Sequence, residues 1–238
     1  MLKYLRLPVT FDTARLQQEV QALAAGNWKA HYNTKHYEGD WSILPLRSIN
    51  GDVNNNYSVH ATASDSHYQD TPLLKTCSYL QTVLAQFNCP KTSVRLMKLD
   101  SGAIIKEHTD YDMYYEAGEA RIHIPVFTNP QVEFYIQQER VMMNEGECWY
   151  LNLNLPHRVS NPGTQDRIHL VIDLLVNDWV KEQFTAPDLY KKEINEEEAL
   201  RKPSPAQQAQ IIAELERSGT PEALQLAAQL RSTLHINT

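Results

Sequence analysis

Cysteine is scarce in this chain: among 238 residues there are three, Cys77, Cys89 and Cys148. An odd number with no C-x-x-C pair argues against a disulfide framework and against a cysteine-ligated zinc site. No run approaches the ~20 apolar residues needed to span a bilayer, and the N-terminus becomes polar too early for a secretory signal. The sequence therefore predicts a cytoplasmic protein that does not enter the membrane.

Positive charge is also low, with 22 Lys and Arg against 29 Asp and Glu and a net charge of −7. A nucleic-acid-binding protein needs a basic surface to displace counterions from phosphates, so the composition argues against this class. The chain is 42% hydrophobic and 21% charged, which is typical of a globular protein. Its length allows one domain with a substantial core and a small appendage.

Two helices are expected in the N-terminal part of the chain. Residues 12–25 have apolar side chains at helical spacing, with Asp12 as the N-cap. Residues 71–88 repeat the pattern, with Thr71 as the cap and a proline at the first helical position. The stretch between them is rich in Asn, Gly, His and Ser, which favours loops and short strands, with residues 42–48 as the best strand candidate.

The chain is rich in β structure from about residue 93 to 176. Short runs of β-branched and aromatic residues alternate there with turn signals, and no helical period separates them. The runs are TSVRLMKL, ARIHIPVF, QVEFYIQ, ERVMM, CWYLNL, HRVS and DRIHLVIDLLV. This pattern is typical of an antiparallel sandwich or barrel. We therefore expect a mainly β domain over residues 1–180, with helices near its N-terminus.

Residues 181–238 are expected to form a charged linker and a two-helix C-terminal extension. Ser204-Pro205 and Thr220-Pro221 each supply a helix cap and a first-turn proline, and each helix has one apolar stripe. We expect the two helices to pack on each other or on a second copy of the chain, which would give a homodimer. Neither helix carries residues suited to chemistry.

Candidate metal ligands lie on the β core. Because alternate side chains of a strand point to one face, His108 and Asp110 are expected on the same side. His157, at the head of a later strand, can add a second imidazole. Two His and one carboxylate form the facial triad typical of non-haem Fe(II) oxygenases, which leaves coordination positions open. The alternative is that these are polar strand ends hydrogen-bonded to nearby backbone.

Arg167 begins the run RIHLVID, which is otherwise strongly apolar. A guanidinium there can hold a carboxylate through two parallel hydrogen bonds. A dicarboxylic keto acid would need such a group, because one end would chelate the metal and the other would require a buried cation. The alternative for Arg167 is a salt bridge to Asp166 or Glu147.

The segments VRLMKLDSGAIIKEHTD, ARIHIPVF, NEGECWYLNLNLPHRVSN and DRIHLVIDLLV resemble the aspartyl/asparaginyl β-hydroxylase family of 2-oxoglutarate- and Fe(II)-dependent dioxygenases. The resemblance spans roughly residues 93–179. It implies a double-stranded β-helix (jelly roll) core, Fe(II), and 2-oxoglutarate as co-substrate. It also implies that O2 is used to hydroxylate an unactivated C–H bond of an amino acid or an Asp/Asn-type side chain, with succinate and CO2 as co-products.

The resemblance also implies roles for particular residues. It assigns His108 and His157 to the iron and Arg167 to the distal carboxylate of 2-oxoglutarate. Arg121 and His123 fall where the family has an Arg-x-His pair near the co-substrate, although a charged outer face of the sheet is the alternative for this pair.

Asp110 departs from part of the family pattern. The animal aspartyl hydroxylases have two His and no carboxylate at the third position. In having Asp110, the chain is more similar to bacterial members that hydroxylate free amino acids, such as the proline cis-4-hydroxylases. Arg95 and Trp149 are candidate substrate contacts, with a surface role and a packing role as their respective alternatives. The expected substrate is a small amino acid or carboxylate.

Two other classes of function account for less of the sequence. A non-catalytic jelly-roll module could bind a metal or small acid and use its C-terminal helices for protein interaction, but it would have no need of Arg167. A zinc hydrolase would require a general acid/base carboxylate near the metal, and strand alternation turns Glu107 away from that position.

Overall fold

The computed structural model describes residues 1–24, 28–31, 34–55, 67–110 and 112–194, and nine single residues between 209 and 231. The chain divides into two compact units, Met1–Ile194 and Asn195–Thr238.

The boundary between the units lies after Ile194, not at residue 180 as the sequence suggested. Residues 181–194 belong to the first unit because strand β14 (Tyr190–Glu193) pairs with β1 (Leu2–Thr10). In the second unit, the described residues are helical. Most of the two expected C-terminal helices, and the homodimer contact expected of them, lie outside the described residues.

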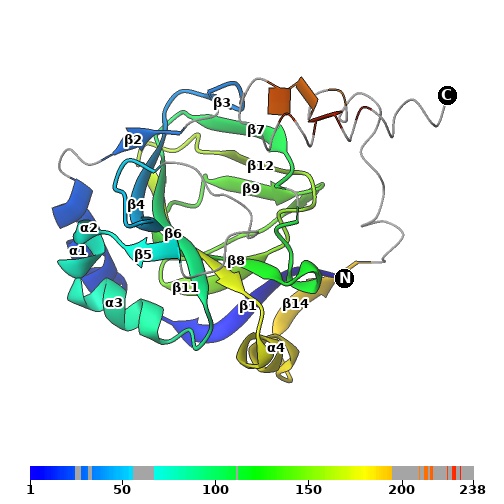
Figure 1. Ribbon diagram of the computed structural model, residues 1–238. Coiled ribbons are helices and arrows are strands. Elements are labelled where there is room, and N and C mark those ends of the chain that lie inside the picture. Colours follow the sequence, from blue (N-terminus) through cyan, green and yellow to red (C-terminus); the bar gives the residue numbers. More distant parts are fainter. Residues whose placement is uncertain are drawn as a thin grey trace. The chain divides into compact units, whose positions relative to one another are not determined.

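The first unit is built from two antiparallel sheets (Figure 1). The larger sheet has the order β14-β1-β11-β8-β13-β6-β4-β2, with β5 paired to β4, and the smaller has the order β10-β9-β12-β7-β3. This is the mainly β, double-stranded β-helix architecture that the resemblance implies.

The remaining strands of the larger sheet are β2 (Lys29–Ala30), β4 (Trp41–Ile49), β5 (Tyr68–Asp70), β6 (Lys91–Leu99), β8 (Glu119–Phe127), β11 (Glu147–Leu151) and β13 (Arg167–Leu175). The smaller sheet consists of β3 (Tyr37–Glu38), β7 (Ile104–His108), β9 (Glu133–Ile136), β10 (Glu139–Arg140) and β12 (His157–Ser160). The expected strands are present, although the run ERVMM is reduced to the two residues of β10. Strands β1 and β14 were not predicted from the sequence.

Helix α1 (Thr13–Ala24) begins where the sequence predicts. The Asp12 carboxylate accepts a hydrogen bond from the backbone N–H of Arg15 at 3.1 Å, as an N-cap does. Helix α4 (Asp178–Thr185) and the short 3-10 turn η2 (Tyr115–Ala117) lie later in this unit. No helix in the described part of the chain is long and apolar enough to cross a membrane.

The prediction of a single helix over residues 71–88 is wrong. The structure has two helices there, α2 (Pro72–Lys75) and α3 (Ser78–Ala85). Thr71 caps α2 as expected. The cap of α3 comes from α1, because the Glu19 carboxylate accepts hydrogen bonds of 2.8 Å from the backbone N–H groups of Tyr79 and Leu80. A carboxylate distant in sequence thus stabilises a second helix start that local periodicity does not show.

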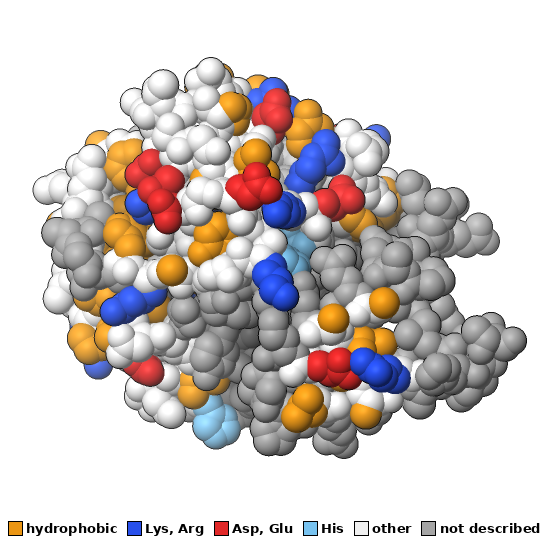
Figure 2. Space-filling view, turned by 90° about the horizontal axis from the view of Figure 1, so that it is seen from above, with side chains coloured by type: hydrophobic (Ala, Val, Ile, Leu, Met, Phe, Trp, Pro, Cys, Tyr) orange, Lys and Arg blue, Asp and Glu red, His pale blue; other side chains and the backbone are white. Residues whose placement is uncertain are grey.

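The two faces of the larger sheet differ in chemistry. On the outer face, side chains such as Leu96, Ile122 and Leu170 form one apolar cluster with residues of α1 and α3. The inner face, turned toward the smaller sheet, carries a set of buried polar side chains: Arg95, Arg121, His123, Arg167, His169 and Asp173. A barrel interior lined with buried charge needs either internal partners or a ligand. Outside, Lys and Arg side chains lie among Asp and Glu on the face shown in Figure 2.

Candidate metal centre

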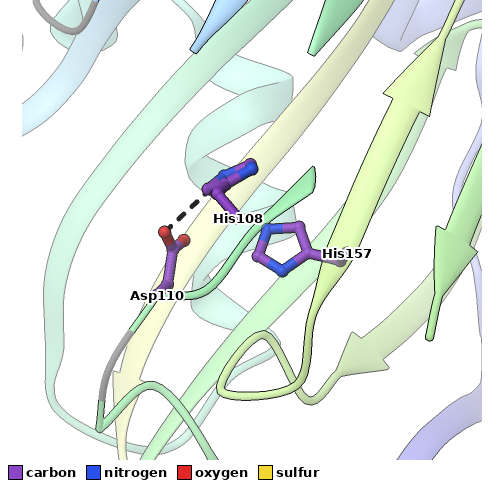
Figure 3. A group of neighbouring side chains, drawn as sticks. All are labelled: His108, Asp110 and His157. Carbon is purple, nitrogen blue, oxygen red and sulfur yellow. Dashed lines mark ion pairs between the residues drawn. The ribbon is translucent and has the colours of Figure 1, made fainter. Parts of the chain in front are cut away.

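The structure brings the three predicted metal ligands together. His108 ends β7 and stands directly opposite His157, the first residue of β12, in the antiparallel pair. Asp110 lies two residues beyond the end of β7, so it follows the strand rather than belonging to it. One ligand atom from each residue lies within 4.8 Å of the other two, and Figure 3 shows the side chains pointing toward one another.

Backbone contacts fix the histidine tautomers. Nδ1 of His108 lies 2.8 Å from the Lys106 carbonyl oxygen, and Nδ1 of His157 lies 3.0 Å from that of Leu155. A carbonyl can only accept, so each Nδ1 carries the proton and each Nε2 keeps its lone pair for a metal. Burial lowers the pKa of His157 to about 3, which keeps this ring neutral at physiological pH.

Asp110 supplies the negative charge of the triad. Its Oδ1 lies 3.8 Å from Nε2 of His108, and its Oδ2 accepts a 2.6 Å hydrogen bond from Nη1 of Arg121. Burial alone would raise the pKa of Asp110, but the Arg121 guanidinium holds it well below its usual value. Two neutral imidazoles and one carboxylate form a donor set that suits Fe(II).

Arg167 is a buried cation, 2% exposed, at the head of β13. Its two expected salt-bridge partners are engaged elsewhere, since Asp166 pairs with Lys98 and Glu147 with Arg6. Within the described residues, no carboxylate pairs with Arg167. Burial lowers its pKa to about 9, so the guanidinium is still charged at neutral pH. A buried charge without a counter-ion is costly, and an anionic ligand would remove that cost.

The space beside Arg167 contains further unsatisfied groups. Arg167 donates from Nη2 to Nδ1 of His169 at 2.8 Å. Its Nε, and the Nε2 atoms of His123 and His169, are buried and have no partner among the described residues. The Phe134 ring stacks on His157 with ring centroids 6.2 Å apart and lies 6.0 Å from the Arg167 guanidinium carbon. The Arg167 guanidinium and the triad therefore border the same interior of the barrel. The hydrogen-bond donors of this interior fit the carboxylate of a keto diacid.

Arg121 and Arg95, however, have internal partners. Arg121 donates to both carboxylate oxygens of Asp173, at 2.6 and 3.0 Å, and Arg95 donates to the same carboxylate at 3.0 Å. The resemblance places Arg121 near the co-substrate; in the structure its Nη1 contacts Asp110, one of the predicted metal ligands. Asp173 was missed in the sequence, although an aspartate that shares a strand face with Arg167 is the signal that could have revealed it.

Trp149 lies among other aromatic side chains. Its indole N–H donates to Glu147 at 2.9 Å, and its ring packs against Tyr4 and Tyr190. It lines a pocket of about 340 Å³, and no member of the triad is among the described residues of that lining. The packing alternative accounts for these contacts.

Glu107 is turned away from the triad, as strand alternation predicts. It is exposed, and its carboxylate lies 3.6 Å from Arg158 on the outside of the smaller sheet. A hydrolase that needs this carboxylate as a general base beside the metal does not fit the arrangement.

Comparisons with known proteins identify several similar chains. L-proline cis-4-hydroxylase of Rhizobium meliloti (strain 1021) is 28% identical over 171 residues, which are 69% of this chain and 58% of that protein, so the chain spans under two thirds of that relative's length. A Pseudomonas putida prolyl-4-hydroxylase structure has a TM-score of 0.45 and 11% identity, covering 74% of this chain and 94% of that one. A 2OG-Fe(II) oxygenase family oxidoreductase from Burkholderia pseudomallei has a TM-score of 0.46 and 15% identity, covering 72% and 85%.

The family assignment rests on a match to most of the first unit. The model of the family described as Aspartyl/Asparaginyl beta-hydroxylase matches residues 10–176, which include the triad and Arg167. The resemblance noted in the sequence is therefore confirmed, and the chain belongs to the aspartyl/asparaginyl β-hydroxylase family.

Proposed function

We propose that this protein is an Fe(II)- and 2-oxoglutarate-dependent dioxygenase that hydroxylates an unactivated C–H bond of an amino acid. One observation carries the proposal: the His-Asp-His triad and the buried guanidinium of Arg167, which has no acidic partner among the described residues, border the same interior. A triad alone would suit several metals and reactions. A triad together with a guanidinium that can bind a carboxylate suits a keto diacid, which can contact the metal at one end and Arg167 at the other.

Different residues would bind the metal ion and the co-substrate. His108, Asp110 and His157 would hold the ion and leave positions open for other ligands. Arg167, with His123 beside it, would hold the distal carboxylate of the co-substrate. When bound, Fe(II) and 2-oxoglutarate supply the oxidising chemistry, in which one oxygen atom of O2 enters the substrate and succinate and CO2 leave. The chain needs no side-chain nucleophile for this reaction.

The substrate would lie against an aromatic wall next to the triad. The His31 ring stacks on Trp41 with centroids 3.5 Å apart, Trp41 lies 6.4 Å from His108, and His36 lies 5.5 Å from His108. The indole N–H of Trp41 is buried with no partner in the described part of the chain. These groups suit a small amino acid, for which the similarity to a proline hydroxylase makes proline the first candidate; an Asp or Asn side chain of a peptide is the second.

The test is substrate-dependent turnover. The full chain, loaded with Fe(II) under anaerobic conditions, is given 2-oxoglutarate, O2 and a panel of free amino acids and Asp- or Asn-containing peptides. We expect succinate release that depends on one class of substrate, with a mass gain of one oxygen in the product. If the chain binds metal but releases no succinate with any member of the panel, the proposal fails and a non-catalytic binding module is supported.

Cytoplasmic location and dimerisation through the C-terminal helices belong to the proposal as well. The three cysteines are free thiols, which suits a reducing compartment. The dimer is tested by the mass of the full chain in solution compared with that of a chain ending at Ile194, the last residue of the first unit.

A further inference from the structure

We infer, on the basis of the metal site proposed above, that Arg121 and Asp173 are positioning residues that hold Asp110 so that it binds the ion through Oδ1 alone. Neither residue belongs to the triad. Together they determine which of the two carboxylate oxygens of Asp110 is available to a metal.

All three nitrogens of the Arg121 guanidinium donate hydrogen bonds to carboxylates. Nε and Nη2 donate to the two oxygens of Asp173, at 2.6 and 3.0 Å, and Nη1 donates to Oδ2 of Asp110 at 2.6 Å. Two parallel bonds to one carboxylate fix the plane of a guanidinium. The third nitrogen is therefore aimed at Asp110 by the pair that Arg121 forms with Asp173.

Asp173 is itself held in place. It stands opposite Arg121 in the β8–β13 register, is 1% exposed, and accepts a further 3.0 Å hydrogen bond from Arg95 on β6. The residues that position Asp110 thus come from three neighbouring strands of the larger sheet, β6, β8 and β13. Asp110, by contrast, follows the end of β7 and lies outside any strand, so its side chain gains the most from an external anchor.

Because Arg121 contacts only one of them, the two carboxylate oxygens of Asp110 have different roles. Oδ2 is occupied by a short charge-assisted bond, whereas Oδ1 faces His108, 3.8 Å from its Nε2. A carboxylate with both oxygens free can bind a metal through both. Binding through one oxygen preserves the open positions that a facial triad offers to a chelating keto acid and to O2.

Among the described residues, the charges of this cluster also balance. Arg95 and Arg121 contribute two positive charges, and Asp173 and Asp110 two negative ones, all linked by the contacts above. Because Asp173 neutralises much of the Arg121 charge, the guanidinium can contact a metal ligand with little repulsion of the cation. A salt bridge that served stability alone would have no reason to extend to a metal ligand, and buried ion pairs contribute little net stability.

The experiment uses Co(II) as the probe, with the full chain and the variants Arg121→Met, Arg121→Lys and Asp173→Asn. Co(II) affinity and the visible absorption bands of the bound ion are measured with and without 2-oxoglutarate, next to thermal unfolding of the metal-free proteins. Arg47→Met is the matched control, since it removes the 2.8 Å pair between Arg47 on β4 and Asp70 on β5 of the same sheet. Supporting residues of a metal ligand typically affect affinity 10–100-fold.

We expect Arg121→Met to weaken Co(II) binding by about 10–100-fold and to alter the absorption bands, because Asp110 is then free to bind through both oxygens. Arg121→Lys should restore part of the affinity, and Asp173→Asn, which keeps the volume of the side chain, should give a smaller loss with the same spectral change. The control should match the wild type in both measurements.

Wild-type affinity and bands in a folded Arg121→Met protein would overturn the inference. If that variant does not fold, the same result in Asp173→Asn overturns it. The outcome is separable from the fate of the proposed function: a chain that binds Co(II) but never oxidises 2-oxoglutarate refutes the dioxygenase proposal while the role of Arg121 is still tested.

Discussion

His108 and His157 stand opposite each other across the β7–β12 pair, with ring centroids 4.2 Å apart. Antiparallel register places the rings on the same face of the smaller sheet, and the backbone carbonyls two residues earlier fix both tautomers. The relative placement of the two imidazoles is therefore a property of strand pairing.

Replacing His157 with Ala should remove metal binding. The triad would lose one of its two imidazoles, and the affinity for Fe(II) or Mn(II), measured by isothermal titration, should fall by more than about a hundredfold, beyond the effect of an outer supporting residue. His67→Ala, at an exposed loop histidine, is the control and should bind as the wild type does. An unchanged affinity in His157→Ala would exclude this residue as a ligand.

Replacing Arg167 with Lys should weaken 2-oxoglutarate binding although the charge is kept. Lysine cannot form the two parallel bonds of a guanidinium, and a charged hydrogen bond contributes about 2 kcal/mol, so we expect the KM for 2-oxoglutarate to rise roughly 30-fold. Arg158→Lys, at a half-buried arginine on β12 outside the barrel interior, should leave the KM unchanged. Equal KM values in the two variants would contradict the proposal that Arg167 binds the distal carboxylate of 2-oxoglutarate.

The β core and the pairing of His108 with Asp110 could be predicted because both depend on local rules. Alternation along a strand predicts His108 and Asp110 on one side, although Asp110 lies just past the end of β7. It also turns Glu107 outward, and turn signals delimit the strands. The apolar character of the run that follows Arg167 marks this residue as exceptional. None of these inferences requires knowledge of which strand lies next to which.

The features that were missed depend on long-range pairing. Arg121 and Asp173 meet because β8 and β13 are neighbours in one particular register, which alternation within each strand does not specify. The break between α2 and α3 depends on Glu19, which caps α3 from another helix. Strand β14 is exposed throughout, and three of its four residues are charged. This is typical of an edge strand and also of a linker, so its sequence alone does not distinguish the two.

Asn161 should be a major contributor to the stability of the barrel end near Arg167. It is fully buried, and its side-chain amide donates to the carbonyl oxygens of Leu99, Asp100 and Gln165, at 3.1, 3.2 and 2.8 Å, while its Oδ1 accepts from Asn129. Replacement by Ala would remove these three donated hydrogen bonds and the bond accepted from Asn129 at a buried position, at a cost of about 3 kcal/mol.

Urea unfolding of the metal-free protein measures this loss. Asn88→Ala, at an exposed asparagine, should change the free energy of unfolding by less than about 0.5 kcal/mol. If the two variants are equally stable, the side-chain bonds of Asn161 do not hold this end of the barrel together.

His31 should make the metal-free protein sensitive to acid. Burial, and next the positive charge of Arg95, lower the pKa of His31 to about 3 in the folded chain, against an ordinary value of about 6.5 in the unfolded chain. Between these values the unfolded chain binds a proton that the folded chain does not. Stability is therefore lost as the pH falls through this window.

The variant His31→Phe isolates this contribution, because a phenyl ring can keep the stacking on Trp41 but cannot bind a proton. Between pH 7 and pH 5 the wild type should lose about 2 kcal/mol more of its unfolding free energy than the variant. Urea titrations at the two pH values, with EDTA present, measure the difference. The other buried histidines, His123, His157 and His169, titrate in both proteins and cancel in the comparison, so equal losses would show that His31 binds its proton as readily in the folded chain as in the unfolded one.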